Sequence, residues 1–151
     1  MRHVRRLTSA LLLVLVVAVI GCRMSHSPTL GVRSGRLLPC PRSPNCVCSQ
    51  DPDPAHQVDP FAFIGPGANA WERLRACVEA EPRTRIIESS PGYLRVEFRS
   101  LLFRFVDDVE FNLEPTAQLI HVRSASRVGY SDLGANRQRI GRLRQAFEAS
   151  K

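Results

Sequence analysis

The stretch that decides the fold is residues 103–139, which reads FRFVDDVEFNLEPTAQLIHVRSASRVGYSDLGANRQR. Its first part alternates between apolar and polar residues, which predicts a β-strand with one buried face. The inward positions of this strand would be Phe103, Phe105, Asp107, Val109, Phe111 and Leu113. Asp107 is the exception among apolar groups, because a carboxylate is costly to bury unless it is hydrogen-bonded or paired. We therefore expect polar partners around Asp107.

A hairpin joins this strand to the next one. Residues 114–117 include a proline between two alternating runs, so a four-residue hairpin loop is expected there. That loop would place Asp107 opposite Ser124 on the inner face. The outer face would carry pairs of opposite charge, Glu110 with His121 and Asp108 with Arg123. Because exposed pairs of this kind contribute only about 0.2–1 kcal/mol each, we expect a solvated charged face.

A helical pattern follows the second strand. Ser131 or Asp132 is a suitable N-cap, and the apolar residues after it have helical spacing: Leu133, Ile140, Leu143 and Phe147. Asn136 falls on the same stripe, with Arg137 at its edge. The predicted buried polar network therefore comprises Asp107, Ser124, Ser126, Asn136 and Arg137, and its simplest role is a structural lock.

The N-terminus has the features of a secretion signal. Three arginines precede an apolar run at residues 10–20, a length typical of a signal core and short for a membrane-spanning helix. The run ends in Val-Ile-Gly-Cys, which resembles the lipobox of bacterial lipoproteins. We therefore expect residues 1–21 to be removed and Cys22 to be acylated, for example with palmitate, which would attach the protein to a membrane. A plain secretory signal and an uncleaved anchor are the alternatives.

The sequence also predicts the segments of the chain and the cellular location of the protein. Residues 22–38 lack periodicity and predict a flexible tether, and residues 39–151 are expected to form one domain. No acidic residue follows Cys22 directly, which favours the periplasmic face of the outer membrane. The net charge is +7, but Arg2, Arg5 and Arg6 lie in the leader. No interleaving of basic and aromatic residues indicates a nucleic-acid partner.

The four cysteines after Cys22 are expected to form disulfides. The spacing of Cys40, Cys46 and Cys48, with His56 nearby, does not fit the common zinc sites, so we predict no metal and no cofactor. An even number of cysteines outside the cytoplasm favours disulfide bonds. Of the three connectivities, we favour Cys40 with Cys46 and Cys48 with Cys77.

The remaining segments complete the predicted fold. Residues 50–67 read as an irregular arm whose apolar patch, Phe61, Phe63 and Ile64, would bind a partner protein if it is exposed. Residues 68–80 have a helical pattern, and residues 85–89 and 93–100 predict strands. The fold class is therefore α+β: an antiparallel four-stranded sheet covered on one face by two helices, in the order helix, four strands, helix, with an irregular disulfide-bearing N-terminal arm.

Three segments carry a family resemblance: CPRSPNCVCS, LRVEFRSLLFRFVDDVEF and HVRSASRVGYSDLGANRQRI. They resemble the bacterial and plastid family known as domain of unknown function 1499, over about residues 38–147. The resemblance implies an α+β domain of the envelope or lumen, and it implies no established reaction, substrate or cofactor.

Two functional hypotheses follow. In the first, the protein is a non-enzymatic envelope module whose arginines engage an anionic ligand or an envelope protein: Arg123, Arg127, Arg137 and Arg139. The simpler alternative is that these arginines only balance nearby acids. In the second, the protein is a hydrolase that uses Ser124 or Ser126 with His121 and either Asp107 or Asp108. A regular strand would point His121 away from both serines, so we favour the non-enzymatic hypothesis.

Overall fold

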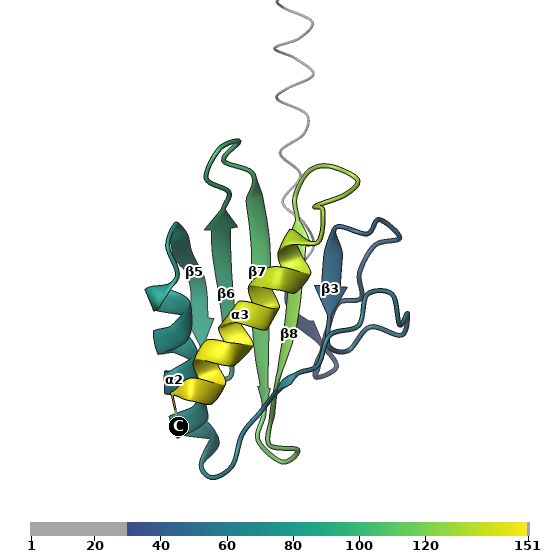
Figure 1. The fold of residues 1–151 in the computed structure, drawn as a ribbon. Coiled ribbons are helices and arrows are strands. Elements are labelled where there is room, and N and C mark those ends of the chain that lie inside the picture. The colour runs from purple at the N-terminus through teal and green to yellow at the C-terminus, as the bar shows by residue number, and fades with distance from the viewer. Residues whose placement is uncertain (1–29, 151) are drawn as a thin grey trace, which may run out of the picture.

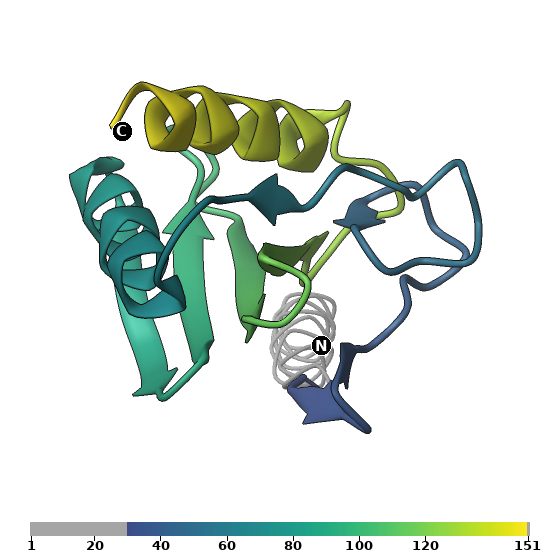
Figure 2. The ribbon, with the colours of Figure 1, turned by 90° about the horizontal axis from the view of Figure 1, so that it is seen from below.

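The centre of the structure is an antiparallel sheet with both helices on one face. The computed structural model describes residues 30–150. Four strands pair in sequence order: β5 (Thr84–Ser90), β6 (Tyr93–Arg99), β7 (Val106–Glu114) and β8 (Leu119–Ser126). Helix α2 (Gly67–Ala80) precedes these strands and helix α3 (Ala135–Ala149) follows them. Figures 1 and 2 show the two helices on the same side of the sheet, with α2 over the β5 edge and α3 running across the middle.

The sheet has six strands, so the expected four-stranded sheet was wrong. The N-terminal arm supplies β3 (Cys46–Cys48) and β4 (Phe61–Ala62), and both pair antiparallel with β8 along its otherwise free edge. A separate two-stranded sheet comprises β1 (Val32–Arg33) and β2 (Arg36–Leu37). Strands of two or three residues are too short to show an alternating pattern in the sequence. They form because the backbone groups at the edge of β8 need hydrogen-bond partners.

The hydrophobic core lies between the sheet and the two helices. Phe61 from the arm packs edge to face against Phe111 of β7 and Phe147 of α3, with ring centroids 5.9 and 5.6 Å apart. Phe63 is also buried, whereas Ile64 is exposed. The arm therefore closes the core, and most of its apolar patch is not available to a partner protein.

The β7–β8 hairpin is shifted by two residues from the predicted register. Glu114 pairs with Leu119, so the loop comprises residues 115–118, and Gln118 adopts a left-handed backbone with φ of 56°. Asp107 therefore lies opposite Ser126 rather than Ser124. The predicted outer-face pairs were also wrong, because Glu110 lies opposite Arg123 and Asp108 opposite Ala125. A shift by an even number of residues keeps each side chain on its predicted face.

Strand β7 starts later than the alternation indicates. It begins at Val106, so Phe103 and Phe105 lie outside the sheet in the β6–β7 loop, residues 100–105, and both are exposed. Leu133, which was expected on the buried stripe of the last helix, is also exposed because α3 begins only at Ala135. These apolar residues therefore do not belong to the core.

The β1–β2 hairpin covers the outer face of the sheet. Figure 2 shows it on the opposite side of the sheet from α3. Leu37 is buried, and the Gly31 N–H donates a hydrogen bond to Glu110 of β7 at 2.6 Å. The part of the predicted tether from residue 30 to residue 38 is thus packed against the domain, and the solvated outer face that was expected is instead covered.

The predicted signal segment and Cys22 lie outside the described residues. Within residues 30–150, neither helix has the length and apolar character needed to cross a bilayer.

Candidate functional site

A buried polar network on the inner face of the sheet connects β7, β8 and α3. Arg139 donates to the Asp107 carboxylate at 2.5 Å and to the Asn136 side-chain oxygen at 2.6 Å. Ser124 donates to the same Asn136 oxygen at 2.5 Å. The Asn136 amide nitrogen donates to Ser126 Oγ and to the backbone oxygen of Asn45, at 3.1 and 3.0 Å. The network therefore ties the N-terminal arm to the sheet and to the closing helix.

The cation of this network is Arg139, whereas the sequence analysis placed Arg137 in it. The Arg139 guanidinium also lies 4.9 Å from the ring centroid of Phe98, on the core side of β6. Arg137 points the other way, and its exposed guanidinium donates to the backbone oxygens of Ala55 and Gln57. The helix begins at Ala135 rather than Leu133, and its buried residues are Asn136, Arg139, Ile140, Leu143 and Phe147.

The outer face of the sheet carries a second, larger group of charges, and its acids are almost completely buried. Asp108 is 1% exposed and Glu110 is fully buried. Arg127 donates to both oxygens of Asp108 at 2.7 and 2.8 Å and to Glu97 at 2.6 Å. Arg95 also donates to Asp108, and Arg123 donates to Glu110 at 3.3 Å. Buried charges of this kind persist only when they are paired, as they are here.

These contacts shift the titration of several groups. Hydrogen bonds to Asp108 and Glu97 raise the pKa of Arg127. Burial by itself would raise the pKa of Glu97, but the hydrogen bonds from Arg127 and Arg99 outweigh it, so the pKa is lowered. Burial and the neighbouring charge of Glu110 raise the pKa of Tyr93. The pair of Glu97 and Arg127 is therefore held in its charged form at neutral pH.

All four arginines of the predicted anion-binding segment make contacts within the domain. Arg123 and Arg127 pair with outer-face acids, and Arg139 pairs with Asp107. Arg137 binds backbone oxygens and has no acidic partner among the described residues; with Arg42 it lines a cavity of about 280 Å³. Of the four, Arg137 is the one with charge left over for an external anion.

His121 lies on the outer face, away from Ser124 and Ser126. Its Nδ1 is 3.2 Å from Ser49 Oγ and its Nε2 is 2.7 Å from Glu114 Oε2. The sequence analysis missed Ser49 and Glu114 because no local motif links them to His121. Ser49 Oγ also accepts the Val122 N–H at 2.9 Å, so the hydroxyl bridges the edge of β8 between β3 and β4. This serine, histidine and carboxylate arrangement replaces the predicted one.

The cysteines form one disulfide. The predicted bond between Cys40 and Cys46 is confirmed. Cys48 and Cys77 are both free, so the second predicted bond was wrong. Cys48 is in β3 at one edge of the sheet, whereas Cys77 is on α2 at the β5 edge (Figure 1). Burial raises the pKa of the Cys48 thiol. No cluster suited to a metal ion occurs among residues 30–150.

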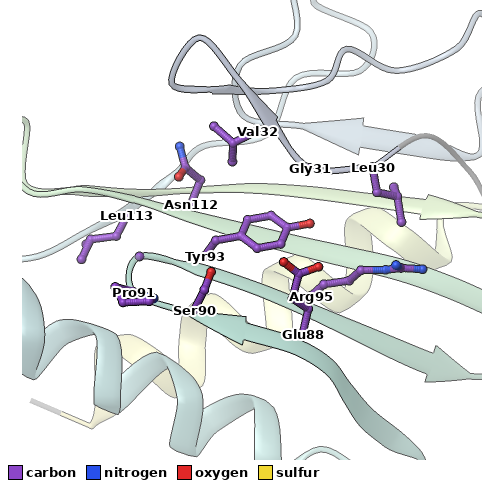
Figure 3. Close-up of a pocket in the computed structure, with 11 residues that line it drawn as sticks. Leu30, Gly31, Val32, Glu88, Ser90, Pro91, Tyr93, Arg95, Asn112 and Leu113 are labelled. Atoms are coloured by element: carbon purple, nitrogen blue, oxygen red, sulfur yellow. The ribbon is translucent and has the colours of Figure 1, made fainter.

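The first of two larger cavities is polar and lies beside the β1–β2 hairpin. It has a volume of about 650 Å³ and is bordered by residues 30–32 and by the β5–β6 hairpin. Figure 3 shows the ring of Tyr93 at its centre, between residues 30–32 on one side and Glu88 and Arg95 on the other. The Tyr93 hydroxyl donates to Glu110 at 2.9 Å, the same carboxylate that holds Gly31. This cavity is therefore part of the contact that holds the N-terminal hairpin.

The second cavity is an apolar cleft of about 830 Å³ at one end of the sheet. Its walls are the β6–β7 loop and the β8–α3 loop, residues 127–134. Asp107 and Ser126 of the inner network lie at its base. The apolar residues that border it are Leu101, Leu102, Phe103, Phe105, Val128 and Leu133. Leu101, Phe103 and Leu133 are 70%, 74% and 90% exposed, so the cleft leaves apolar surface open to solvent.

Comparisons with known proteins give one match. No curated protein and no solved structure matches the chain. The sequence matches a protein family over residues 36–147, which spans the covering hairpin from β2 onward, the sheet and nearly all of α3. The chain therefore belongs to the family described as "Protein of unknown function (DUF1499)".

Proposed function

We propose that this protein is a non-enzymatic lipoprotein of the cell envelope, a binding or assembly module attached to a membrane through Cys22 and engaging other molecules through the apolar cleft. The observation that supports it most is the contrast between two kinds of surface. The buried acids of the sheet are paired with arginines, whereas large apolar side chains at the cleft remain exposed. Exposed apolar patches on a domain with a complete core are typical of interaction sites.

The inner network connects the elements that form the cleft. The cleft walls emerge from the ends of β6, β7 and β8 and the start of α3, which are the elements that the network of Asp107, Ser126 and Asn136 connects. A rigid base under two loops is the arrangement expected of a preorganised binding surface. The network therefore has a structural role in this proposal, and its serines need no catalytic one.

Photo-crosslinking tests binding through the cleft. A photoreactive amino acid replaces Leu102, which is 81% exposed, in the full-length protein, and the protein is expressed in its native cells. The control carries the same amino acid at Thr116, an exposed residue of the β7–β8 loop at the other end of the sheet. We expect adducts, with lipid or with protein, from position 102 and not from position 116. Equal or absent adducts at both positions would overturn binding through the cleft.

Acylation has a separate test. Metabolic labelling with a palmitate analogue should mark the native chain, and Cys22→Ser should abolish the label. Mass spectrometry of the purified protein should find Cys22 as the modified N-terminal residue. An unlabelled native chain that starts elsewhere would remove the lipid anchor from the proposal, while leaving the crosslinking result unaffected.

Anion binding is a finer part of the same proposal, and it now centres on Arg137. Its guanidinium faces only backbone oxygens, and the cavity that it shares with Arg42 has basic and acidic groups on its walls. Inorganic phosphate should raise the melting temperature of the native protein more than that of Arg137→Ala. The same stabilisation in both proteins would exclude Arg137 as the anion site.

The alternative function is a hydrolase, and the contact that favours it is the Ser49–His121–Glu114 chain. A carboxylate, an imidazole and a hydroxyl in series is the arrangement that activates a serine nucleophile. Ser49 Oγ already accepts the Val122 N–H, however, which is what a purely structural bridge requires. A fluorophosphonate probe that labels Ser49 in the native protein and not in Ser49→Ala would establish the alternative. The non-enzymatic proposal expects no labelling of either.

A further inference from the structure

We propose that the occupant of the apolar cleft is the lipid bilayer itself: the β6–β7 and β8–α3 loops insert their apolar side chains into the membrane interface. This inference deepens the proposed function and rests on it for the anchor at Cys22. Nine large apolar side chains are exposed in residues 30–150, and six of them belong to these two loops: Leu101, Leu102, Phe103, Phe105, Tyr130 and Leu133. The exposed apolar surface is thus concentrated at one end of the molecule.

The β6–β7 loop is built as a rigid projection. Its ends are joined by two hydrogen bonds of 2.9 Å, from the Ser100 N–H to the Phe105 oxygen and from the Phe105 N–H to Ser100 Oγ. The rings of Phe103 and Phe105 stack with centroids 5.5 Å apart. Figure 1 shows this loop and the β8–α3 loop projecting from the same end of the sheet. A closed loop with stacked rings keeps its apolar side chains exposed without refolding.

The exposure of these side chains favours a broad apolar surface over a small ligand. A small ligand is held by side chains that line a concavity and are themselves largely covered. Leu102 and Leu133 are 81% and 90% exposed, so they extend past the cleft and would remain exposed around a ligand bound inside it. A bilayer would cover the tips of both loops together.

The composition of the tip fits a membrane interface. Leucine and phenylalanine enter the acyl region, and tyrosine prefers the level of the head groups. Arg104 is the one charged residue of the β6–β7 loop, and it has no ion-pair partner among the described residues. A long arginine side chain can bury its stem while its guanidinium contacts lipid phosphate. Asp132 of the second loop is occupied by the Gly134 and Asn136 N–H groups at the start of α3.

The length of the chain between Cys22 and residue 30 is also compatible with contact of the loops with the membrane. Glu110, which holds Gly31, is four residues along β7 from Val106, so it lies roughly 14 Å from the end of the strand at the cleft. The eight peptide steps from Cys22 to Leu30 can span up to about 27 Å. An acyl group on Cys22 can therefore lie in the same membrane plane as the two loops. A protein partner bound at the cleft would not require this match.

Tryptophan fluorescence tests the insertion. The full-length acylated protein is reconstituted in vesicles of phosphatidylethanolamine and phosphatidylglycerol, with the single native tryptophan removed as Trp71→Phe. One variant adds Phe103→Trp at the loop tip, and the matched control adds Thr116→Trp at the opposite end of the sheet. We expect lipids brominated on their acyl chains to quench the fluorescence at position 103 strongly, and the fluorescence at position 116 little. Emission at position 103 should also shift to shorter wavelength.

The other outcomes are distinct. Quenching of position 103 by aqueous acrylamide but not by brominated lipid would show a loop in solvent, and would overturn the inference. Protection of position 103 from both quenchers would show that a second copy of the protein covers the loop tip, which also overturns it but leaves the proposed binding module intact. Leu102→Asp should move the tryptophan at position 103 to a shallower depth, whereas Thr116→Asp should not. Circular dichroism of each variant checks that the fold is kept.

Discussion

At the scale of single residues, Asp107 and Arg139 form the buried ion pair of the inner network. Their side chains are 8% and 9% exposed, and each is the ionic partner of the other. Ser124 and Asn136 accept hydrogen bonds from the other terminal nitrogen of Arg139, so the pair is embedded in hydrogen bonds as well. Such a pair need not add to stability in total, but breaking it leaves a buried charge without a partner.

Asp107→Asn should therefore destabilise the protein by about 3–5 kcal/mol, because it leaves the Arg139 guanidinium buried and unpaired. Urea unfolding followed by circular dichroism measures the change. The control is Arg137→Ala, which removes an exposed guanidinium two residues away on the same helix and should cost much less. Equal losses from the two variants would contradict the assignment of Arg139 to the network.

The thiols provide a second test at this scale. Cys77 is half-buried on α2, whereas Cys48 is fully buried and its pKa is raised by burial, so less reactive thiolate forms. Iodoacetamide should label Cys77 in the native protein and Cys48 only after unfolding. Cys40 and Cys46 should need reduction as well as unfolding. Peptide mass spectrometry reads all four sites, and a Cys48–Cys77 disulfide peptide would contradict the structure.

At the scale of elements, the β1–β2 hairpin covers the outer face of the sheet and shields its charged residues from solvent. The hairpin is short and has few contacts of its own, but Glu110 receives three donors: Arg123, Tyr93 and the Gly31 N–H. Leu37 is fixed nearby through the Gln50 side chain. A fully buried carboxylate with three partners is a strong reason for the chain to keep this conformation.

Glu110→Gln should loosen the hairpin and destabilise the domain by about 3–5 kcal/mol, because Arg123 loses the one acidic partner that it has within residues 30–150. Hydrogen exchange should increase first at residues 31–37. Tyr93→Phe removes one hydrogen bond from the same carboxylate and should cost only about 1 kcal/mol. If exchange at residues 31–37 is unchanged in Glu110→Gln, then the hairpin is held by other contacts.

The ion pairs of Glu97 with Arg99 and Arg127 make the sheet sensitive to acid. The pKa of Glu97 is lower in the folded protein than in the unfolded chain, because the hydrogen bonds from Arg127 and Arg99 favour the charged form. Its contribution to stability is therefore fully present above the unfolded pKa of about 4.3 and is lost as the pH falls through the lower folded value. Melting temperatures between pH 7 and pH 3 should fall less steeply for Glu97→Gln than for the native chain. Parallel curves would exclude Glu97 as a source of the acid sensitivity.

At the scale of the whole molecule, the two polar systems leave the exposed apolar surface at one end. The inner network joins the sheet to α3 and the arm, and the outer charges join it to the N-terminal hairpin. The acids of both systems are paired within the domain, and both systems stop before the tips of the two loops around the cleft. The proposed contact with the membrane uses the end of the domain at which most of the exposed large apolar side chains of residues 30–150 lie.

Several features of the fold and site could be predicted from residues close together in the sequence. The alternation from Val106 to Leu113 and the stripe on α3 correctly indicate which side chains face the helix-covered core, and the position of Asp107 on that face indicates a polar network. The choice of Arg139 over Arg137 could not be predicted, because the two residues flank the same apolar stripe and only the packing of α3 on the sheet decides which of them meets Asp107. The register of β7 and β8 depends on a left-handed Gln118, for which the sequence has no clear signal.

The sequence by itself determined the central hairpin, the faces of its strands, the helix that covers it and the short-range disulfide, because each depends on a periodic pattern or on neighbouring residues. Only the tertiary structure decided which arm segments complete the sheet, which arginine meets Asp107, and that Cys48 and Cys77 stay apart. It also places Phe103 and Phe105, which were expected in the core, in an exposed loop. These features depend on contacts between residues far apart in the chain, and the free energy of such contacts is set by burial and geometry, which no local pattern contains.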